Sequence, residues 1–207
     1  MTISASPSVI GLTGPFGTGC STAAATLVSR RGYRSFLLSS LISDRWKRKN
    51  PHTTPRRADL QALGNEIRRT SGNPGALADL AIGEIERSKN QWSSIVIDGI
   101  RNVGEVEVLK ERFGQHFYLI ALECPQSERW RRLRPTYEKE GLALEDFLRD
   151  NEQDRLQEYA HGQQVQLCVD RADVLLRNDR NERKIKYAQL SRKLLEYLDL
   201  VSGTTPR

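Results

Sequence analysis

The chain has 207 residues, a size that suits one α/β domain with a full hydrophobic core. Apolar residues make up 38% of it, its mean hydropathy is −0.57, and no segment resembles a membrane span or a secretory leader, so we expect a cytoplasmic protein without membrane contact. The formal charge of +6 favours an anionic ligand. Arginine-rich runs at 45–49 and 129–134 suit solvated helix faces or a phosphate clamp, and without a recognisable module we do not expect nucleic acid.

Apolar runs alternate with amphipathic segments, which predicts a parallel sheet covered by helices on both faces. The expected strands are residues 8–12, 34–38, 94–98, 116–123 and 174–177. The expected helices are residues 21–28, 57–70, 76–89, 103–112, 127–134, 144–159, 163–171 and 182–200. We therefore predict one α/β domain over 1–200, a three-layer sandwich with a mainly parallel sheet of about five strands. It would carry a helical insertion at about 39–90, a short lid at about 127–142 and a tail or linker at 201–207.

A glycine-rich segment between the first expected strand and helix carries the strongest functional signal. It reads Gly14-Pro15-Phe16-Gly17-Thr18-Gly19-Cys20-Ser21 and follows the phosphate-binding pattern G-x-x-x-x-G-K-[ST], except for the lysine. Such glycines let successive backbone N–H groups point at an anion beside a helix N-terminus. We expect ATP or another nucleoside triphosphate to bind here, through Gly14, Phe16, Gly17, Thr18, Gly19, Cys20, Ser21 and Thr22. The alternative is a glycine-rich turn without a ligand.

Cys20 stands where the pattern has lysine. Losing one charged hydrogen-bond partner removes about 1.5–3 kcal/mol of binding free energy, which is a ten- to hundredfold loss of affinity. Phosphate binding can therefore survive, whereas phosphoryl transfer depends more strongly on the missing charge. A thiol at a helix N-terminus tends toward thiolate, which would repel phosphate. We favour the simpler interpretation of a small neutral side chain. With Cys124 and Cys168 the cysteines are odd in number and dispersed, which argues against a disulfide framework, and no zinc motif is present.

A second group of residues ends the third expected strand. Asp98 follows an apolar run, and a carboxylate there can hold Mg²⁺ opposite the Ser21 hydroxyl. Arg101 would point into the same cleft, where its planar fork suits a phosphate. A helix cap for Asp98 and a surface ion pair for Arg101 are the structural alternatives.

Together the loop and the Asp98-Gly99-Ile100-Arg101 segment resemble the P-loop nucleoside and deoxynucleoside monophosphate kinases, with dephospho-coenzyme A kinase-like proteins among the nearest. The resemblance spans nearly the whole chain and implies a P-loop NTPase fold of the nucleotide-kinase type. It implies an acceptor-side helix in which Asn65 and Arg68 contact the substrate, with Arg101 beside them. An ordinary amphipathic helix explains Asn65 and Arg68 equally well.

The same resemblance implies a lid over the transferring phosphate and a loop around the donor base. We expect two catalytic arginines, Arg101 and, in the lid, Arg132 ahead of Arg129, and Asn178 follows the last strand near the donor base. Asn178 also suits a plain turn. The segment at 38–43 departs from the family, because it has serines where relatives show Asp and then Arg, and Arg45 is the candidate replacement.

A subset of relatives is closer still: the kinase-like front domain of some deoxycytidylate deaminase-like proteins. The loop resembles it, as do Asp154 and the segment at 162–170, in which Gln163 and Gln164 also suit exposed helix positions. In those proteins the domain precedes a zinc deaminase and acts as a nucleotide-responsive regulator, so a deaminase domain in cis or in trans is an expected partner.

Two functions follow from these residues. The first is Mg²⁺-dependent phosphoryl transfer from ATP to a (deoxy)nucleoside monophosphate, and the second is nucleotide sensing with little or no catalysis. The retained acid and arginines favour nucleotide binding in both cases, while the missing lysine favours the second.

Overall fold

The computed structural model describes residues 9–88, 94–155, 160–179 and 186–201. Its centre is a sheet of five strands, all paired in parallel in the order β2-β3-β1-β4-β5. The strands are β1 (Val9–Thr13), β2 (Arg34–Leu37), β3 (Ile95–Ile100), β4 (Phe117–Glu123) and β5 (Val174–Arg177). The predicted α/β class and parallel five-stranded sheet are confirmed. All carboxyl ends meet at one edge, which is where open α/β sheets bind their ligands.

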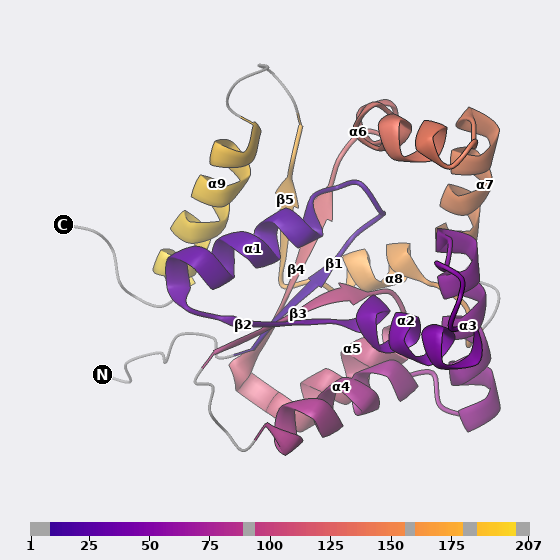
Figure 1. The fold of residues 1–207 in the computed structure, drawn as a ribbon. Helices are drawn as coiled ribbons and strands as arrows, with labels where there is room; N and C mark the ends of the chain where they lie inside the picture. The colour runs from indigo at the N-terminus through magenta and orange to yellow at the C-terminus, as the bar shows by residue number, and fades with distance from the viewer. Residues whose placement is uncertain (1–8, 89–93, 156–159, 180–185, 202–207) are drawn as a thin grey trace.

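Helices lie on both faces of the sheet (Figure 1). They are α1 (Cys20–Arg31), α2 (Leu38–Lys49), α3 (Arg57–Ser71), α4 (Ala76–Arg87), α5 (Val103–Phe113), α6 (Gln126–Lys139), α7 (Leu144–Arg155), α8 (Val165–Asp170) and α9 (Lys186–Val201), with a 3-10 turn, η1 (Gly114–His116). On one face α1 and α9 pack on Ile10, Leu12 and Ile120. On the other, α4 and α5 pack on Ile97 and Leu119.

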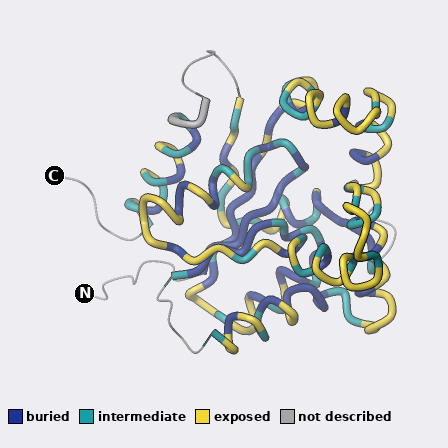
Figure 2. Tube along the Cα trace, viewed as in Figure 1, coloured by how far each residue is buried: buried dark blue, intermediate teal, exposed yellow. Residues whose placement is uncertain are grey.

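The central strands β1, β3 and β4 are buried on both faces, because consecutive residues face opposite layers and helices cover both, whereas the edge strands β2 and β5 are mostly exposed or half-buried. In β3, Val96 joins the cluster under α1, while Ile95 and Ile97 join the cluster above α5. Figure 2 shows the central strands as buried, with long exposed stretches on α6 and α7. A third, small cluster of Phe16, Tyr137 and Phe147 holds α6 and α7 against the tip of the glycine loop.

Several expected boundaries shift. The expected strand at 34–38 ends earlier, because Leu38 begins α2. Helix α2 itself was not among the expected helices, since it starts after Leu37 without a capping side chain and therefore lacks the usual start signal. The helix expected at 127–134 continues through Pro135 to Lys139, and that expected at 163–171 is shorter.

Parts of other expected elements lie outside the described residues: residue 8, residue 89, residues 156–159 and 182–185, and most of the tail at 201–207. The division into an insertion, a lid and a tail stays a prediction. None of the helices within the described ranges has the length and apolar character that a membrane span requires.

One glycine in the sheet is required for packing. An added Cβ at Gly11 would lie 2.7 Å from Ile100 Cδ1 and 2.7 Å from Phe117 Cζ. We expect Gly11→Ala to lower the free energy of unfolding by about 1–3 kcal/mol through overpacking, measured by urea unfolding. Gly83→Ala in α4 is the matched control, because nothing lies within 4 Å of its added Cβ. It should stabilise the protein by about 0.5–1 kcal/mol. Equal effects at the two sites would contradict this packing.

Candidate functional site

A cavity of about 780 Å³ lies at the carboxyl ends of the strands, between the glycine loop and helices α2, α3, α6 and α7. Its volume falls in the range of small-molecule sites. Predicted site residues that line it are Gly14, Phe16, Gly17, Thr18, Gly19, Cys20, Ser21, Thr22, Arg68, Asp98, Arg101, Arg132 and Asn178. Asn65 is not among the lining residues. The fold therefore brings nearly all of the predicted residues to one cavity.

The glycine loop has the backbone geometry of an anion site. Gly14, Gly17 and Gly19 have φ values of 144°, 83° and 110°, which side chains disfavour. At Gly14 an added Cβ would also lie 2.3 Å from a β4 carbonyl oxygen. The first helical bond of α1 runs from Ala23 N to Gly19 O, at 2.9 Å. The amides of residues 20–22 precede it and have no acceptor within the helix, so they are available to a phosphate.

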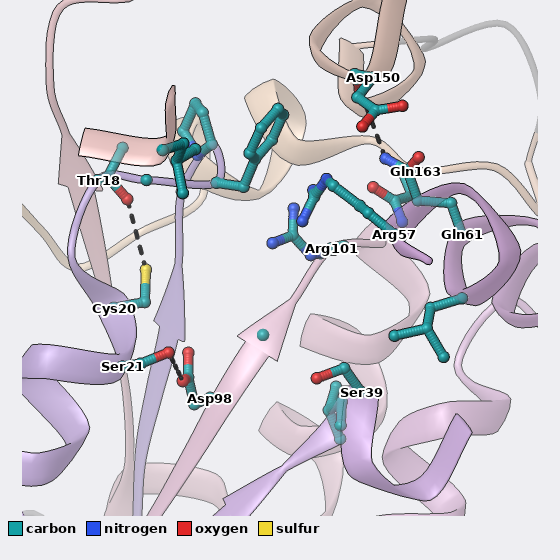
Figure 3. A pocket seen from close by; sticks show the side chains of 18 of the residues that line it. Thr18, Cys20, Ser21, Ser39, Arg57, Gln61, Asp98, Arg101, Asp150 and Gln163 are labelled. Carbon is teal, nitrogen blue, oxygen red and sulfur yellow. Dashed lines mark hydrogen bonds between the residues drawn. The ribbon is translucent and has the colours of Figure 1, made fainter. Parts of the chain in front are cut away.

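Cys20 occupies the lysine position as a neutral thiol. Burial and the neighbouring Asp98 carboxylate raise the pKa of the Cys20 thiol to about 12. The thiol donates to Thr13 O at 3.5 Å and lies 3.6 Å from Thr18 Oγ1 (Figure 3). At neutral pH it therefore adds no negative charge to the site, in agreement with the interpretation as a small neutral side chain.

Ser21 and Asp98 meet across the mouth of the loop. Ser21 Oγ donates to Asp98 Oδ2 at 2.9 Å (Figure 3), and burial raises the pKa of Asp98. Gly99, with a φ of 89°, forms a bulge, because Leu12 pairs with Asp98 but Thr13 pairs with Ile100. Because the bulge adds one residue, the side chains of Asp98 and Arg101 lie on the same side of the strand. A hydroxyl beside a carboxylate, with water and phosphate oxygens, is a ligand set that Mg²⁺ accepts.

A buried carboxylate organises two of the arginines that line the cavity. Asp154 of α7 is completely buried. It accepts from Arg101 Nη1 at 3.0 Å, from Arg57 Nη2 at 3.0 and 3.1 Å, and from Gln61 Nε2 at 2.8 Å. Burial raises the pKa of Asp154, but Arg101 and Arg57, with hydrogen bonds from Gln61 and the Phe16 backbone, outweigh it and hold that pKa low. The cluster therefore carries one net positive charge.

Both arginines face the cavity (Figure 3). The Arg57 guanidinium lies 3.7 Å from the centroid of the Phe16 ring. Burial opposes the charge of Arg101, but the attraction of Asp154, together with that of Asp98 and Glu105 and the influence of Cys20, outweighs burial and raises the pKa of Arg101. Arg57 and Gln61 were not predicted as site residues; the signal available was their place at the start of α3, shortly before Asn65. Arg45, the expected replacement for the missing family arginine, is exposed and does not line the cavity.

Arg68 is held by a buried ion pair. Its Nη2 lies 2.7 Å from Glu105 Oε1, and both side chains are almost completely buried. Arg68 Nη1 also donates to Asn65 Oδ1 at 3.1 Å. Glu105 Oε2 accepts from the backbone N of Arg101 at 2.8 Å and of Asn102 at 3.1 Å. Arg68 therefore supports the segment that carries Arg101, and the predicted contact of Asn65 and Arg68 with substrate stays a prediction.

Helix α6 braces the glycine loop. Arg132 donates to Gly17 O at 3.1 Å and to Asn178 O at 3.0 Å, and Arg129 donates to Phe16 O at 3.1 Å. Asn178 Nδ2 donates to Thr18 O at 2.7 Å. Arg132 lines the cavity, whereas Arg129 is not among the lining residues. The catalytic role of Arg132, ranked ahead of Arg129, stays a prediction.

The thiol chemistry of Cys20 is directly testable. With a pKa of about 12, Cys20 should react with iodoacetamide at pH 8 about a thousandfold more slowly than free cysteine, because the thiolate is the nucleophile. Asp98→Asn should speed the reaction, since it removes a charge that raises this pKa. Asp44→Asn, an exposed change on α2, is the control. Peptide mass spectrometry separates Cys20 from Cys124 and Cys168, and labelling as fast as free cysteine would refute the neutral thiol.

Comparison with known proteins identifies the family. A model of the AAA domain matches residues 10–156. A UPF0200/UPF0201 protein of Archaeoglobus fulgidus is 34% identical over 100 residues, 48% of this chain and only 30% of that relative's length. A UPF0200 protein of Saccharolobus solfataricus is 29% identical over 197 residues, 93% of each chain. A gluconokinase from Sinorhizobium meliloti superposes with a TM-score of 0.54 at 15% identity, covering 96% of this chain and 95% of that one.

The structural likeness establishes the fold and leaves the acceptor open. The matched family and structure support the coarser P-loop kinase-like fold, and the narrower resemblances to dephospho-coenzyme A kinase-like and deaminase-associated proteins stay predictions. Because the family model covers more than half of the residues, the chain belongs to the AAA domain family, and it has a P-loop kinase-like fold.

Proposed function

We propose that this protein is a Mg²⁺-dependent phosphotransferase that moves a phosphoryl group from ATP, or another nucleoside triphosphate, to a (deoxy)nucleoside monophosphate in the cytoplasm. One observation carries the proposal: the Ser21–Asp98 pair and the Arg57–Arg101 pair line the same cavity. A metal-ligand pair and an arginine pair in one cavity are what two phosphate groups and one Mg²⁺ require.

The donor side is the glycine loop. The free amides at the start of α1 suit the donor phosphates. Asn178 and Arg132 hold the loop carbonyls of Thr18 and Gly17, so these amides need little rearrangement on binding. Asn178 then lies close to where the donor nucleoside leaves the loop.

Ser21 and Asp98 suit Mg²⁺ because both present oxygen ligands. Within the described ranges no group of three or more His, Cys, Asp or Glu side chains could hold a metal. Phosphate oxygens and water would therefore complete the ligand set. When bound, the ion would neutralise negative charge on the donor phosphates. The raised pKa of Asp98 would fall again beside a cation.

The acceptor side is formed by α3 and the end of β3. Arg57 and Arg101 share one carboxylate and leave one positive charge in the cavity, which suits an acceptor phosphate. The carboxamide oxygens of Gln61 and Gln163 are buried beside the cavity, and neither oxygen has a hydrogen-bond partner among the described residues. An acceptor with N–H or O–H donors would satisfy them after a small rotation.

The second candidate function is a nucleotide-sensing domain with little or no turnover, associated with a deoxycytidylate deaminase-like protein. The neutral Cys20 thiol favours it, because the lysine that usually reaches the terminal phosphates is replaced by an uncharged group. The contacts of α6 with the loop also fit a sensor, since occupancy of the loop would be transmitted to the lid.

A coupled phosphoryl-transfer assay separates the two functions. The acceptor panel contains nucleoside and deoxynucleoside monophosphates, and also gluconate, for which the superposed gluconokinase is named. Calorimetry with ATP runs in parallel. Turnover of a monophosphate supports the enzyme, ATP binding without turnover of any acceptor supports the sensor, and the absence of both contradicts nucleotide binding itself.

The Mg²⁺ ligands give the next prediction. Ser21→Ala and Asp98→Asn should each lower Mg²⁺-dependent ATP affinity about ten- to hundredfold, because each removes an oxygen ligand or its charge. Ser29→Ala is the matched control on the same helix, where the hydroxyl only bonds the Thr26 carbonyl. Titration of ATP by calorimetry, with Mg²⁺ and with EDTA, measures the difference. Unchanged Mg²⁺ dependence in both variants would exclude this metal site.

The acceptor arginine gives another prediction. Arg57→Gln should raise the KM for the acceptor monophosphate about ten- to hundredfold while leaving the Kd for ATP nearly unchanged, because Arg57 lies on the acceptor wall. Arg45→Gln is the matched control, since Arg45 is exposed outside the cavity. Initial rates over a grid of donor and acceptor concentrations separate the two constants. A selective loss of ATP affinity in Arg57→Gln would place the donor on this wall instead.

A further inference from the structure

The glycine loop lacks the lysine of the pattern, but several arginines line the same cavity as Cys20. Among the described residues that line the cavity, none is a lysine. The arginines that line it are Arg56, Arg57, Arg68, Arg101, Arg132 and Arg149. The question is which of them can reach the terminal phosphate of a donor held by the loop.

Arg101 follows a strand whose end is tied to the start of the loop. It follows Ile100, which pairs in register with Thr13, the residue before Gly14. Thr13 Oγ1 also donates to Ile100 O at 2.9 Å, so the end of β3 is tied to the start of the loop. The bulge at Gly99 turns Arg101 to the same side as Asp98, which bonds Ser21.

The guanidinium of Arg101 is held in place by Asp154, but it remains accessible from the cavity. Nη1 donates to Asp154 at 3.0 Å, about a fifth of the side chain stays exposed, and Figure 3 shows it pointing into the cavity. Cys20, Asp98 and Arg101 line the same cavity, so the guanidinium shares it with the lysine position and the metal position.

The other lining arginines are paired or exposed: Arg149 pairs with Asp146, and Arg56 is exposed at the start of α3. Arg132 donates to loop carbonyls and to Glu128, and Arg68 is bound to Glu105. Arg57 stacks on Phe16 and binds both oxygens of Asp154.

We propose that Arg101 replaces the missing loop lysine, supplying from the end of β3 the positive charge that contacts the terminal phosphate of the donor. This assignment rests on the proposed function and adds a donor-side role to a residue otherwise grouped with the acceptor. Asp154 is then a positioning residue, because its hydrogen bond holds the Arg101 guanidinium in the cavity.

A double-mutant cycle between positions 20 and 101 tests this assignment. The measured quantity is the Kd for Mg²⁺-ATP, with Mg²⁺-ADP as the probe that lacks the terminal phosphate. Arg101→Gln should weaken ATP binding about ten- to hundredfold and ADP binding much less. Cys20→Lys should restore ATP affinity in the Arg101→Gln background. In the wild-type background it should change affinity less than about threefold, because the charge is already present.

The outcomes separate the assignment from the proposed function. If the wild-type protein binds ATP and Cys20→Lys raises affinity by the same factor in both backgrounds, Arg101 does not replace the lysine. If the wild-type protein binds no ATP, the proposed function fails and this assignment fails with it. Arg57→Gln is the matched control, because it shares Asp154 with Arg101, and Cys20→Lys should not repair its acceptor KM.

One single variant decides the matter even if Arg101→Gln does not fold. Cys20→Lys alone introduces the residue that the loop pattern usually has, and it leaves Arg101 and Asp154 intact. A gain of more than about tenfold in ATP affinity would mean that no other cation was serving the phosphate, which overturns the assignment. A gain below about threefold supports it. Thermal unfolding monitors the fold of each variant.

Discussion

The buried carboxylate of Asp154 is the interaction on which the site depends. It is completely buried in α7, yet it stays ionised because Arg101, Arg57 and Gln61 all donate to it. Removing a charge from such a cluster is costly, since the remaining buried charge would be unpaired. One side chain thus fixes α3, the end of β3 and α7 relative to one another, and it sets the walls of the cavity.

The glycine loop is stabilised from the other direction. Arg129 and Arg132 of α6 and Asn178 after β5 all donate to its carbonyl oxygens. With its carbonyl oxygens bonded in this way, the loop keeps its amide N–H groups directed toward the cavity, where they can bind an anion. The loop can therefore keep its shape with a neutral Cys20, because the protein, rather than a lysine and its phosphate, holds the backbone. The charge is a separate requirement, which the arginines on Asp154 can meet.

The sequence predicted the features that depend on neighbours along the chain. The apolar run before Asp98 and the glycine spacing from Gly14 to Gly19 are local patterns, and both predicted the correct strand and loop. The role of Arg57 could not be predicted, because its partner Asp154 lies 97 residues away and is reached only through the fold. Helix α2 was missed for a different reason, since Leu37 offers no capping side chain.

The small aromatic cluster of Phe16, Tyr137 and Phe147 has a consequence for thermal behaviour. It is separate from the two large clusters that sandwich the sheet. Regions with few buried contacts open at lower free energy than the core that supports them. Because Phe16 belongs both to this cluster and to the loop, melting of the outer helices would release the tip of the loop while the sheet persists. Ligand recognition would then be lost on warming before the secondary structure is.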